Sequence, residues 1–212
     1  MSFYNSSDHG AQAEKARLRD LFRERRRFIP ADLRNTTQWK VINHLRSLQG
    51  AFQPSVIGLY HPLAGEIDLR GWAKELWADG NTVALPRVVA HGHPLTYNIW
   101  YEGAPLELDA LGIPCATGPE IWPAIMVVPC LGYTKNGFRL GYGGGFYDIT
   151  LKHMALPTTT VGVAYTELEV EHFPAEYHDQ PLDYIVTGKE VITTRPTLRG
   201  AAAAAIAAGF AQ

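Results

Sequence analysis

The sequence predicts an α/β fold in which helices flank a mostly parallel central sheet, and three observations support this. Short apolar runs alternate along the chain with segments that have the period of an amphipathic helix. The run "AIMVVPCLGY" (124–133) is apolar throughout, which is typical of a central strand covered on both faces. The segment 55–89 reads strand, helix, strand, with a helix long enough to connect two parallel strands. These features together indicate a Rossmann-like, three-layer arrangement.

Two helices are predicted at the N-terminal end of the chain. Over 14–28, apolar residues recur at helical spacing and form a narrow stripe on a very basic helix. Lys15 and Arg19 are one turn apart on this helix and therefore share a face. A second helix is predicted over 32–49, because the apolar period continues there and Gly50 follows it.

The middle of the chain reads as strands separated by one helix and one long loop. Strands are predicted for 55–62, 82–89 and 94–103, with an amphipathic helix over 69–77 that Gly80 ends. The Pro- and Gly-rich segment 108–124 is predicted to be loop.

The C-terminal half is predicted to hold the central strand 124–133, a turn at Asn136-Gly137 and a helix that begins near Gly145. Two further strand-like runs follow, 158–165 and 183–192. We expect a single domain over 1–195, since 212 residues with 46% hydrophobic content can bury one large core. The alanine-rich segment 196–212 is expected to be a tail.

Composition and charge exclude several classes of protein. A formal net charge of -2 argues against nucleic-acid binding, and the arginines at positions 23 and 25–27 are interpreted as a solvated helix face. The first twenty residues lack the apolar run of a secretory signal, and the alanine-rich tail is too short for a membrane helix. Cys115 and Cys130 have no metal-site spacing, so we expect a protein of the reducing cytoplasm, without a membrane partner.

The stretch "RLGYGGGFYD" (139–148) has glycine at four of the five positions 141–145, between a strand and a predicted helix start. Backbone N–H groups at a helix start attract phosphate, and glycine lets the anion approach them. Arg139 and Lys135 are candidate cations, and Asp148 is a candidate ligand for Mg²⁺ carried by the phosphates. A tight structural turn is the alternative for the glycines.

Six segments in order resemble the 5-formyltetrahydrofolate cyclo-ligase family, also called methenyltetrahydrofolate synthetase. They are "KARLR" (15–19), "YHPLAGEIDLR" (60–70), "VALPRV" (83–88), "LGIPCA" (111–116), "VVPCLGYTKNGFRLGYGGGFYD" (127–148) and "AEYHDQPLDYIVT" (175–187). The resemblance extends from Lys15 to Ile192. It implies a reaction in which ATP and Mg²⁺ convert 5-formyltetrahydrofolate to 5,10-methenyltetrahydrofolate, with ADP and phosphate released.

The resemblance also implies roles for individual residues. The ATP site would comprise Lys15, Arg19, Arg139, Leu140, Gly141, Tyr142, Gly143, Gly144, Gly145, Phe146 and Tyr147. Arg139 and Tyr147 are expected to be catalytic, Asp148 and Asp179 to hold Mg²⁺, and His61 and Glu66 to contact the reduced folate. Each has a structural alternative, such as a solvated helix face for Lys15 and Arg19 or a turn before Pro181 for Asp179. A monomer or weak dimer is expected.

The sequence departs from the family pattern mainly on the folate side. Cys130, Phe146 and His61 replace the residues usual at those positions, and "IPCATGPEIW" lacks the acidic ending of the family's segment. Two alternatives therefore stay open. One is a paralogue that keeps the nucleotide site but acts on another formyl or amide compound, and the other is an ATP-binding regulatory module without turnover.

Overall fold

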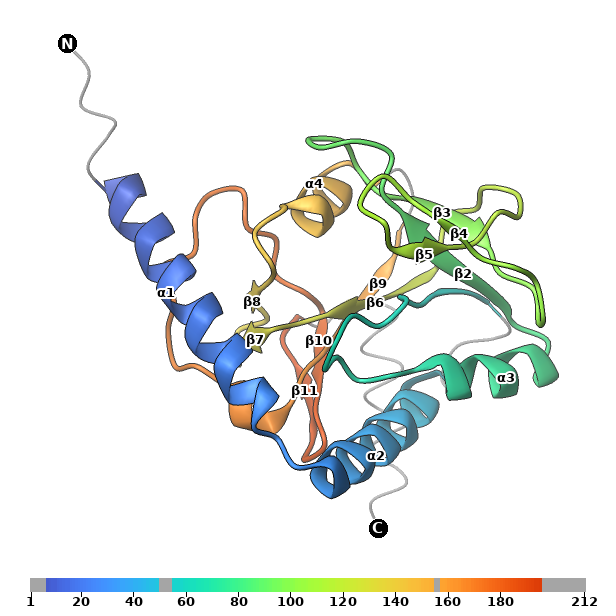
Figure 1. The fold of residues 1–212 in the computed structure, drawn as a ribbon, viewed down its shortest axis with the longest axis horizontal. Helices are drawn as coiled ribbons and strands as arrows, with labels where there is room; N and C mark the ends of the chain where they lie inside the picture. The colour runs from blue at the N-terminus through green and yellow to red at the C-terminus, as the bar shows by residue number, and fades with distance from the viewer. Residues whose placement is uncertain (1–6, 50–54, 155–156, 196–212) are drawn as a thin grey trace.

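The computed structural model describes residues 7–49, 55–154 and 157–195 of the chain (Figure 1). A seven-stranded sheet has the order β11-β10-β9-β6-β1-β2-β3. Its strands are β1 (Val56–Gly58), β2 (Thr82–Arg87), β3 (Thr96–Ile99), β6 (Ile125–Pro129), β9 (Thr159–Val163), β10 (Tyr184–Val186) and β11 (Val191–Thr193). The helices are α1 (Ser7–Arg27), α2 (Ala31–Gln49), α3 (Arg70–Ala78), α4 (Phe146–Lys152) and a 3₁₀ turn, η1 (Thr166–Leu168).

The five strands β2, β1, β6, β9 and β10 are parallel to one another. The edge strands β3 and β11 each pair antiparallel with their neighbour in the seven-stranded sheet. The unit β1-α3-β2 is the predicted strand-helix-strand crossover. The prediction of an α/β fold with a mostly parallel sheet is therefore confirmed.

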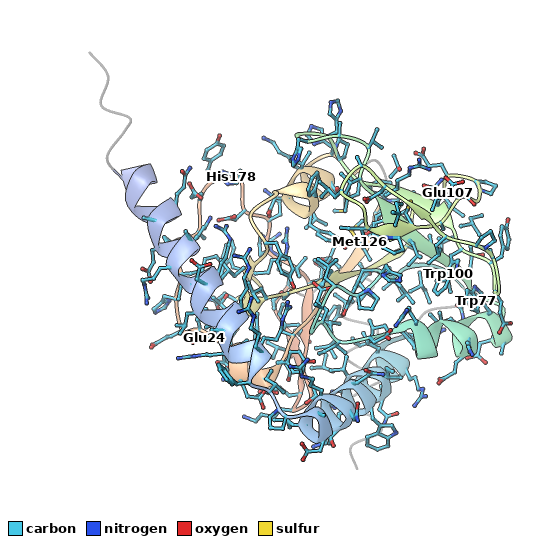
Figure 2. All side chains as sticks on the ribbon, viewed as in Figure 1. Glu24, Trp77, Trp100, Glu107, Met126 and His178 are labelled. Carbon is cyan, nitrogen blue, oxygen red and sulfur yellow. The ribbon has the colours of Figure 1, made fainter. Side chains whose placement is uncertain are left out.

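Alternate residues of each central strand face opposite layers, as the pleat of a strand requires. In β6, Ile125 and Val127 belong to the core shared with α1, α2 and α3, whereas Met126 and Val128 belong to the core under α4. Figure 1 shows α4 on the opposite side of the strands from α2 and α3, and Met126 lies near the middle of the molecule in Figure 2. The two outer layers differ in helix content. On the side of α4, loops cover the part of the sheet that this short helix leaves open.

Three local predictions need correction. Helix α1 begins at Ser7 rather than near residue 14. The run 183–192 is a hairpin, β10 and β11, rather than one strand, because the Thr187 hydroxyl accepts the N–H groups of Lys189 and Glu190 and turns the chain. The segment 108–124, predicted to be loop, includes part of a small two-stranded sheet. Its strand β4 (Glu107–Leu108) lies at the start of the segment and pairs with β5 (Pro114–Cys115) inside it.

Asp109 explains the small sheet. Its carboxylate accepts hydrogen bonds from the N–H groups of Val88, Leu111 and Ile113 at 2.8–3.0 Å, which closes the turn between β4 and β5 and ties it to the end of β2. Proline and glycine were therefore correct signals of irregular backbone, but the aspartate determines how that backbone folds.

The position of β1 in the sheet creates a crevice. Strand β1 lies between β2 and β6 and is parallel to both. The chain therefore continues from β1 to a strand on one side of it and later returns to a strand on its other side. The loops that follow β1 and β6 therefore diverge at the carboxyl ends of these strands, which is where ligands bind in open α/β sheets.

Helix α1 lies along the side of the molecule (Figure 1) and packs closely on the segment after β6. The Phe22 ring is 1% exposed, and a Cβ atom at Gly132, in β7 (Gly132–Tyr133), would overlap it. Only glycine lets the two elements approach this closely. Among the helices that the described segments contain, none is long and apolar enough to cross a membrane. The alanine-rich tail lies outside the described residues.

We expect Gly132→Ala to lower the free energy of unfolding by about 2 kcal/mol, because the added methyl group overlaps the buried Phe22 ring. Gly71→Ala is the matched control. Gly71 lies in α3, and no atom lies within 4 Å of the place that an added methyl group would take, so alanine there should stabilise the protein by about 1 kcal/mol or less. Chemical denaturation measures both, and equal stability of the two variants would contradict this packing.

Candidate active site

A cavity of about 410 Å³ opens at the carboxyl ends of the central strands. Tyr60 and His61 after β1, Pro86 and Val88 at the end of β2, and Pro129 at the end of β6 contribute to its lining. Its volume is within the range of small-molecule sites. The crevice that the strand order creates thus holds a cavity large enough for a small molecule.

Residues 141–145, here called the glycine stretch, form one wall of this cavity. The stretch leaves the hairpin of β7 and β8 (Arg139–Leu140) and ends at Gly145, whose φ of 68° places it in the left-handed region just before α4. Gly143 has a φ of 100°, which also disfavours any side chain. In the part of the chain that the structure describes, the N–H groups of residues 141–145 have no hydrogen-bond partner. Such a row of open donors is suited to an anion.

Arg19 of α1 reaches across to the glycine stretch. Its Nε donates a hydrogen bond to the Gly141 carbonyl at 3.0 Å, and its guanidinium carbon lies 3.6 Å from where a Cβ atom of Gly143 would be. This contact places a cation beside the open N–H groups and increases the preference of the wall for an anion.

Arg139, which precedes the glycine stretch in β8, and Asp148, which follows it in α4, form a partly buried ion pair. Arg139 donates to Asp148 Oδ1 at 2.8 Å and to the Gln180 carbonyl at 2.7 Å, and the Gln180 N–H also donates to Asp148 Oδ1 at 3.0 Å. The late loop around Gln180 is therefore bonded to both residues. Arg139 is only 8% exposed, so these partners compensate for the cost of burying its positive charge.

Lys15 joins α1 to the same late loop. Its Nζ lies 2.7 Å from Glu176 Oε2 and 2.5 Å from Asp179 Oδ2, and the residue is 4% exposed. The Glu176 N–H donates to Asp179 Oδ2 at 2.6 Å, which holds the two carboxylates together. His178, on the segment beside α1 in Figure 2, has its Nε2 3.7 Å from Glu176 Oε2.

The carboxylates retain oxygens suited to Mg²⁺. Asp148 Oδ1 and Asp179 Oδ2 accept the hydrogen bonds described above, whereas Asp148 Oδ2 and Asp179 Oδ1 have no hydrogen-bond partner among the described residues. Mg²⁺ in nucleotide sites takes one or two carboxylates plus phosphate and water oxygens. No group of three or more potential ligands that would form an all-protein metal site occurs in the described segments. The residues present therefore fit a metal shared with a phosphate ligand.

Glu66 and His61 line the same cavity from the loop after β1. Glu66 Oε2 accepts the Leu63 N–H at 2.7 Å, while Glu66 Oε1 and His61 Nδ1 are buried without a hydrogen-bond partner in this part of the structure. Burial raises the pKa of Glu66, against the smaller opposing effects of the Leu63 N–H, Tyr142 and Arg26. Burial also lowers the pKa of His61, with Arg70 nearby, and favours its neutral form.

Every residue to which the family resemblance gives a role in the site lines this one cavity. They are Lys15, Arg19, His61, Glu66, Arg139, Leu140, Gly141, Tyr142, Gly143, Gly144, Gly145, Phe146, Tyr147, Asp148 and Asp179. Their individual roles stay predictions. Lys135 is not among the lining residues, because it is exposed and pairs with Glu169 at 3.6 Å.

Two features escaped the sequence analysis. Glu176 is a second carboxylate partner of Lys15, beside Asp179. Its position two residues before His178-Asp179 was the signal in the sequence that could have indicated this role. The arginine cluster of α1 is not uniformly solvated, because Arg26 is 7% exposed, whereas Arg25 and Arg27 are exposed as predicted.

The comparisons with known proteins agree with the resemblance found in the sequence. Residues 11–188 match the model of the 5-formyltetrahydrofolate cyclo-ligase family. The chain belongs to this family. The predictions of the family and of an enzyme of the ligase class are thereby confirmed.

Individual relatives cover nearly the whole family region. The 5-formyltetrahydrofolate cyclo-ligase of Haemophilus influenzae is 30% identical over 185 residues, which are 82% of this chain and 98% of the relative. The solution structure of Aquifex aeolicus 5,10-methenyltetrahydrofolate synthetase aligns with a TM-score of 0.73 and 29% identity, over 86% of this chain and 94% of that one. A Mycoplasma pneumoniae synthetase aligns with a TM-score of 0.67 at 19% identity, over 82% of this chain and 99% of that one, and supports the fold.

The departures from the cyclo-ligase pattern differ in their distance from the cavity. Cys130 and Cys115 are buried and do not line it, and burial raises the pKa of Cys130 to about 12, so its thiol stays protonated. Phe146 lines the cavity with its ring centroid 5.6 Å from that of His91. Among these departures from the family pattern, His61 is therefore the one that places a polar side-chain atom at the cavity.

We expect Glu66→Gln to be more stable than the parent protein at neutral pH, with a difference that shrinks as the pH falls. The raised pKa means that the folded state binds the Glu66 proton more tightly than the unfolded state. The parent therefore loses stability as the pH rises from the unfolded pKa through the folded pKa, and glutamine removes this loss.

Thermal unfolding of both proteins between pH 4 and pH 8 measures the effect. The exposed residue Glu75, which pairs with Arg46 on the surface, supplies the control variant Glu75→Gln. A pH-independent difference between Glu66→Gln and the parent would show that the Glu66 pKa is not raised in the folded protein.

Proposed function

We propose that this cyclo-ligase family member uses ATP and Mg²⁺ to convert 5-formyltetrahydrofolate to 5,10-methenyltetrahydrofolate, with release of ADP and phosphate. The observation that carries the proposal is that one cavity is lined both by the glycine stretch with its cations and by the Glu66 loop. A nucleotide phosphate and a polar heterocycle placed there would be close enough to react.

On the nucleotide side, the open N–H groups of the glycine stretch receive the phosphates, and Lys15, Arg19 and Arg139 neutralise their charge. Asp148 and Asp179 hold Mg²⁺ through their free oxygens. When bound, this ion neutralises the phosphate charge that grows during transfer of a phosphoryl group.

On the folate side, Glu66 accepts hydrogen bonds from the N–H groups of the pterin ring through its unpartnered Oε1. The neutral imidazole of His61 supplies a second polar contact at the same wall. Leu63, Val88 and Leu95 add apolar surface for the aromatic part of the substrate.

The chemistry requires positioning more than a strong base. An N-formyl carbonyl is a poor electrophile, and hydroxide is a poor leaving group. Transfer of the γ-phosphoryl group from ATP to the formyl oxygen makes that oxygen a leaving group. N10 then attacks the formyl carbon and loses its proton, and the C–O bond breaks so that phosphate departs and takes up this proton. Arg139 and Tyr147 are the residues that we propose contact the transferring group, since both line the cavity beside the glycine stretch.

The direct test supplies purified protein with 5-formyltetrahydrofolate, ATP and Mg²⁺. We expect the absorbance of methenyltetrahydrofolate, compared with an authentic standard, to appear together with one ADP per product. Absence of this product would refute the proposal. ADP release with only another formyl or amide compound would support a paralogue, and ATP binding without ADP release from any of them would support a regulatory module. Cytoplasmic location and a monomer or weak dimer remain predictions.

We expect Arg139→Ala and Asp148→Asn to impair use of ATP more than use of folate. Loss of Arg139 removes a charge from the phosphate wall and should raise the KM for ATP about tenfold or more. Asp148→Asn keeps a hydrogen-bond acceptor for Arg139 but removes a metal-binding charge, so it should raise the Mg²⁺ concentration needed for half-maximal rate.

Steady-state kinetics at varied ATP, folate and Mg²⁺ measure these changes. The exposed pair Arg46–Glu75, at 2.6 Å, supplies controls of the same chemistry outside the cavity, Arg46→Ala and Glu75→Gln, which should leave all three constants unchanged. An Asp148→Asn variant with the parental Mg²⁺ requirement would remove this residue from the proposed metal site.

A further inference from the structure

Arg26 is a buried cation that the proposed reaction does not use. It is 7% exposed, although it lies in the arginine-rich end of α1, and it does not line the cavity. Burying a guanidinium group is costly unless its donors are satisfied. Its hydrogen bonds therefore show what the burial achieves.

The two terminal nitrogens of Arg26 bond to two segments far apart in the sequence. One donates to the hydroxyl of Tyr142 in the glycine stretch, and the other donates to the carbonyl of Ala64 at 3.0 Å. The Arg26 guanidinium also lies over the Tyr142 ring, 5.4 Å from its centroid. A lysine has a single nitrogen on a flexible stem, so it does not reproduce the planar fork with which the two guanidinium nitrogens reach the two acceptors.

The Ala64 carbonyl belongs to the tight turn that carries Glu66. The Glu66 N–H donates to the Leu63 carbonyl at 2.9 Å, and Glu66 Oε2 accepts the Leu63 N–H, so the turn is closed on itself. Gly65 at its tip has a φ of 79°, and a Cβ atom there would lie 3.3 Å from Arg26 Nε. Arg26 is thus packed against this turn as well as bonded to it.

We propose that Arg26 is a positioning residue that fixes the Glu66 turn relative to the glycine stretch and thereby sets the distance between the two halves of the cavity. The inference rests on the proposed function for its kinetic consequence, because only then do the two halves hold two substrates. Its structural part, the mechanical link between the two loops, does not depend on which molecules bind.

Arg23 is the matched control for charge. It lies one turn earlier on α1 and also approaches Tyr142, with its guanidinium 5.8 Å from the ring centroid and a contact to the Tyr142 carbonyl at 3.5 Å. Its side chain is 40% exposed and pairs with Asp20, and no contact joins it to the Glu66 turn in the described structure. Arg23→Met therefore removes a charge beside Tyr142 without breaking the link.

The experiment compares Arg26→Lys, Arg23→Met and Tyr142→Phe with the parent by hydrogen-deuterium exchange and by steady-state kinetics. Arg26→Lys keeps the charge but loses one of the two bonds, and we expect about tenfold faster exchange of amides in the 60–69 segment and a similar rise in the KM for folate. Tyr142→Phe removes the hydroxyl that bonds to Arg26 and that also interacts with Glu66, so faster exchange should appear in the glycine stretch as well as in the Glu66 turn. Thermal unfolding confirms that each variant is folded.

Each outcome decides the inference or the proposed function separately. Parental exchange of the 60–69 segment in Arg26→Lys, or an equal effect of Arg23→Met there, would overturn the link. Faster exchange in Arg26→Lys with a parental KM for folate would overturn its kinetic role. A parent protein that forms no methenyltetrahydrofolate would refute the proposed function, while the exchange data would still support or overturn the link.

Discussion

The strand order at β1 is the constraint on which the rest of the structure depends, since the strands that follow β1 are added first on one side of it and then on the other. Because β2 and β6 lie on opposite sides of β1, the loops after β1 and β6 separate and leave a crevice that no strand fills. One loop carries His61 and Glu66, and the segment after β6 leads to the glycine stretch. Any sequence that forms these five parallel strands in this order must bring the two segments face to face, whatever their side chains.

Buried charges then determine how far apart these segments lie. Lys15, Arg26 and Arg139 each have two hydrogen-bond acceptors from other elements, and together they connect α1, the Glu66 turn, the glycine stretch and the late loop 176–180. A buried cation with satisfied donors tolerates little displacement, since each lost bond exposes an unpaired charge in a poorly solvated site. The network therefore holds open donors and free carboxylate oxygens in place before a ligand arrives, which lowers the cost of binding.

The sequence was informative where chemistry depends on local spacing and uninformative where it depends on distant partners. The four-residue spacing of Lys15 and Arg19 and the glycine pattern are local, so their common site was predictable. Whether an arginine of α1 is solvated depends on loops some 40 and 120 residues later, which is why Arg26 was interpreted as a surface residue. The hairpin of β10 and β11 was missed for a related reason, since the hydroxyl bonds of Thr187 outweigh the strand propensity of the run that contains it.

The two walls of the cavity differ in how their polar groups are satisfied, and this difference bears on specificity. On the phosphate wall, the cations Arg139, Lys15 and Arg19 already have protein partners, and the N–H groups of residues 141–145 are the donors that an anion can satisfy. On the opposite wall, Glu66 Oε1 and His61 Nδ1 are buried without partners in the described structure, and each costs free energy until a ligand supplies a hydrogen bond. A ligand that lacks the matching groups leaves both costs in place, so this wall favours a ligand with complementary polar groups. Because His61 is also the departure from the family pattern that presents a polar atom there, we expect the choice of acceptor, under the proposed function, to depend on that histidine more than on the residues proposed to bind the nucleotide.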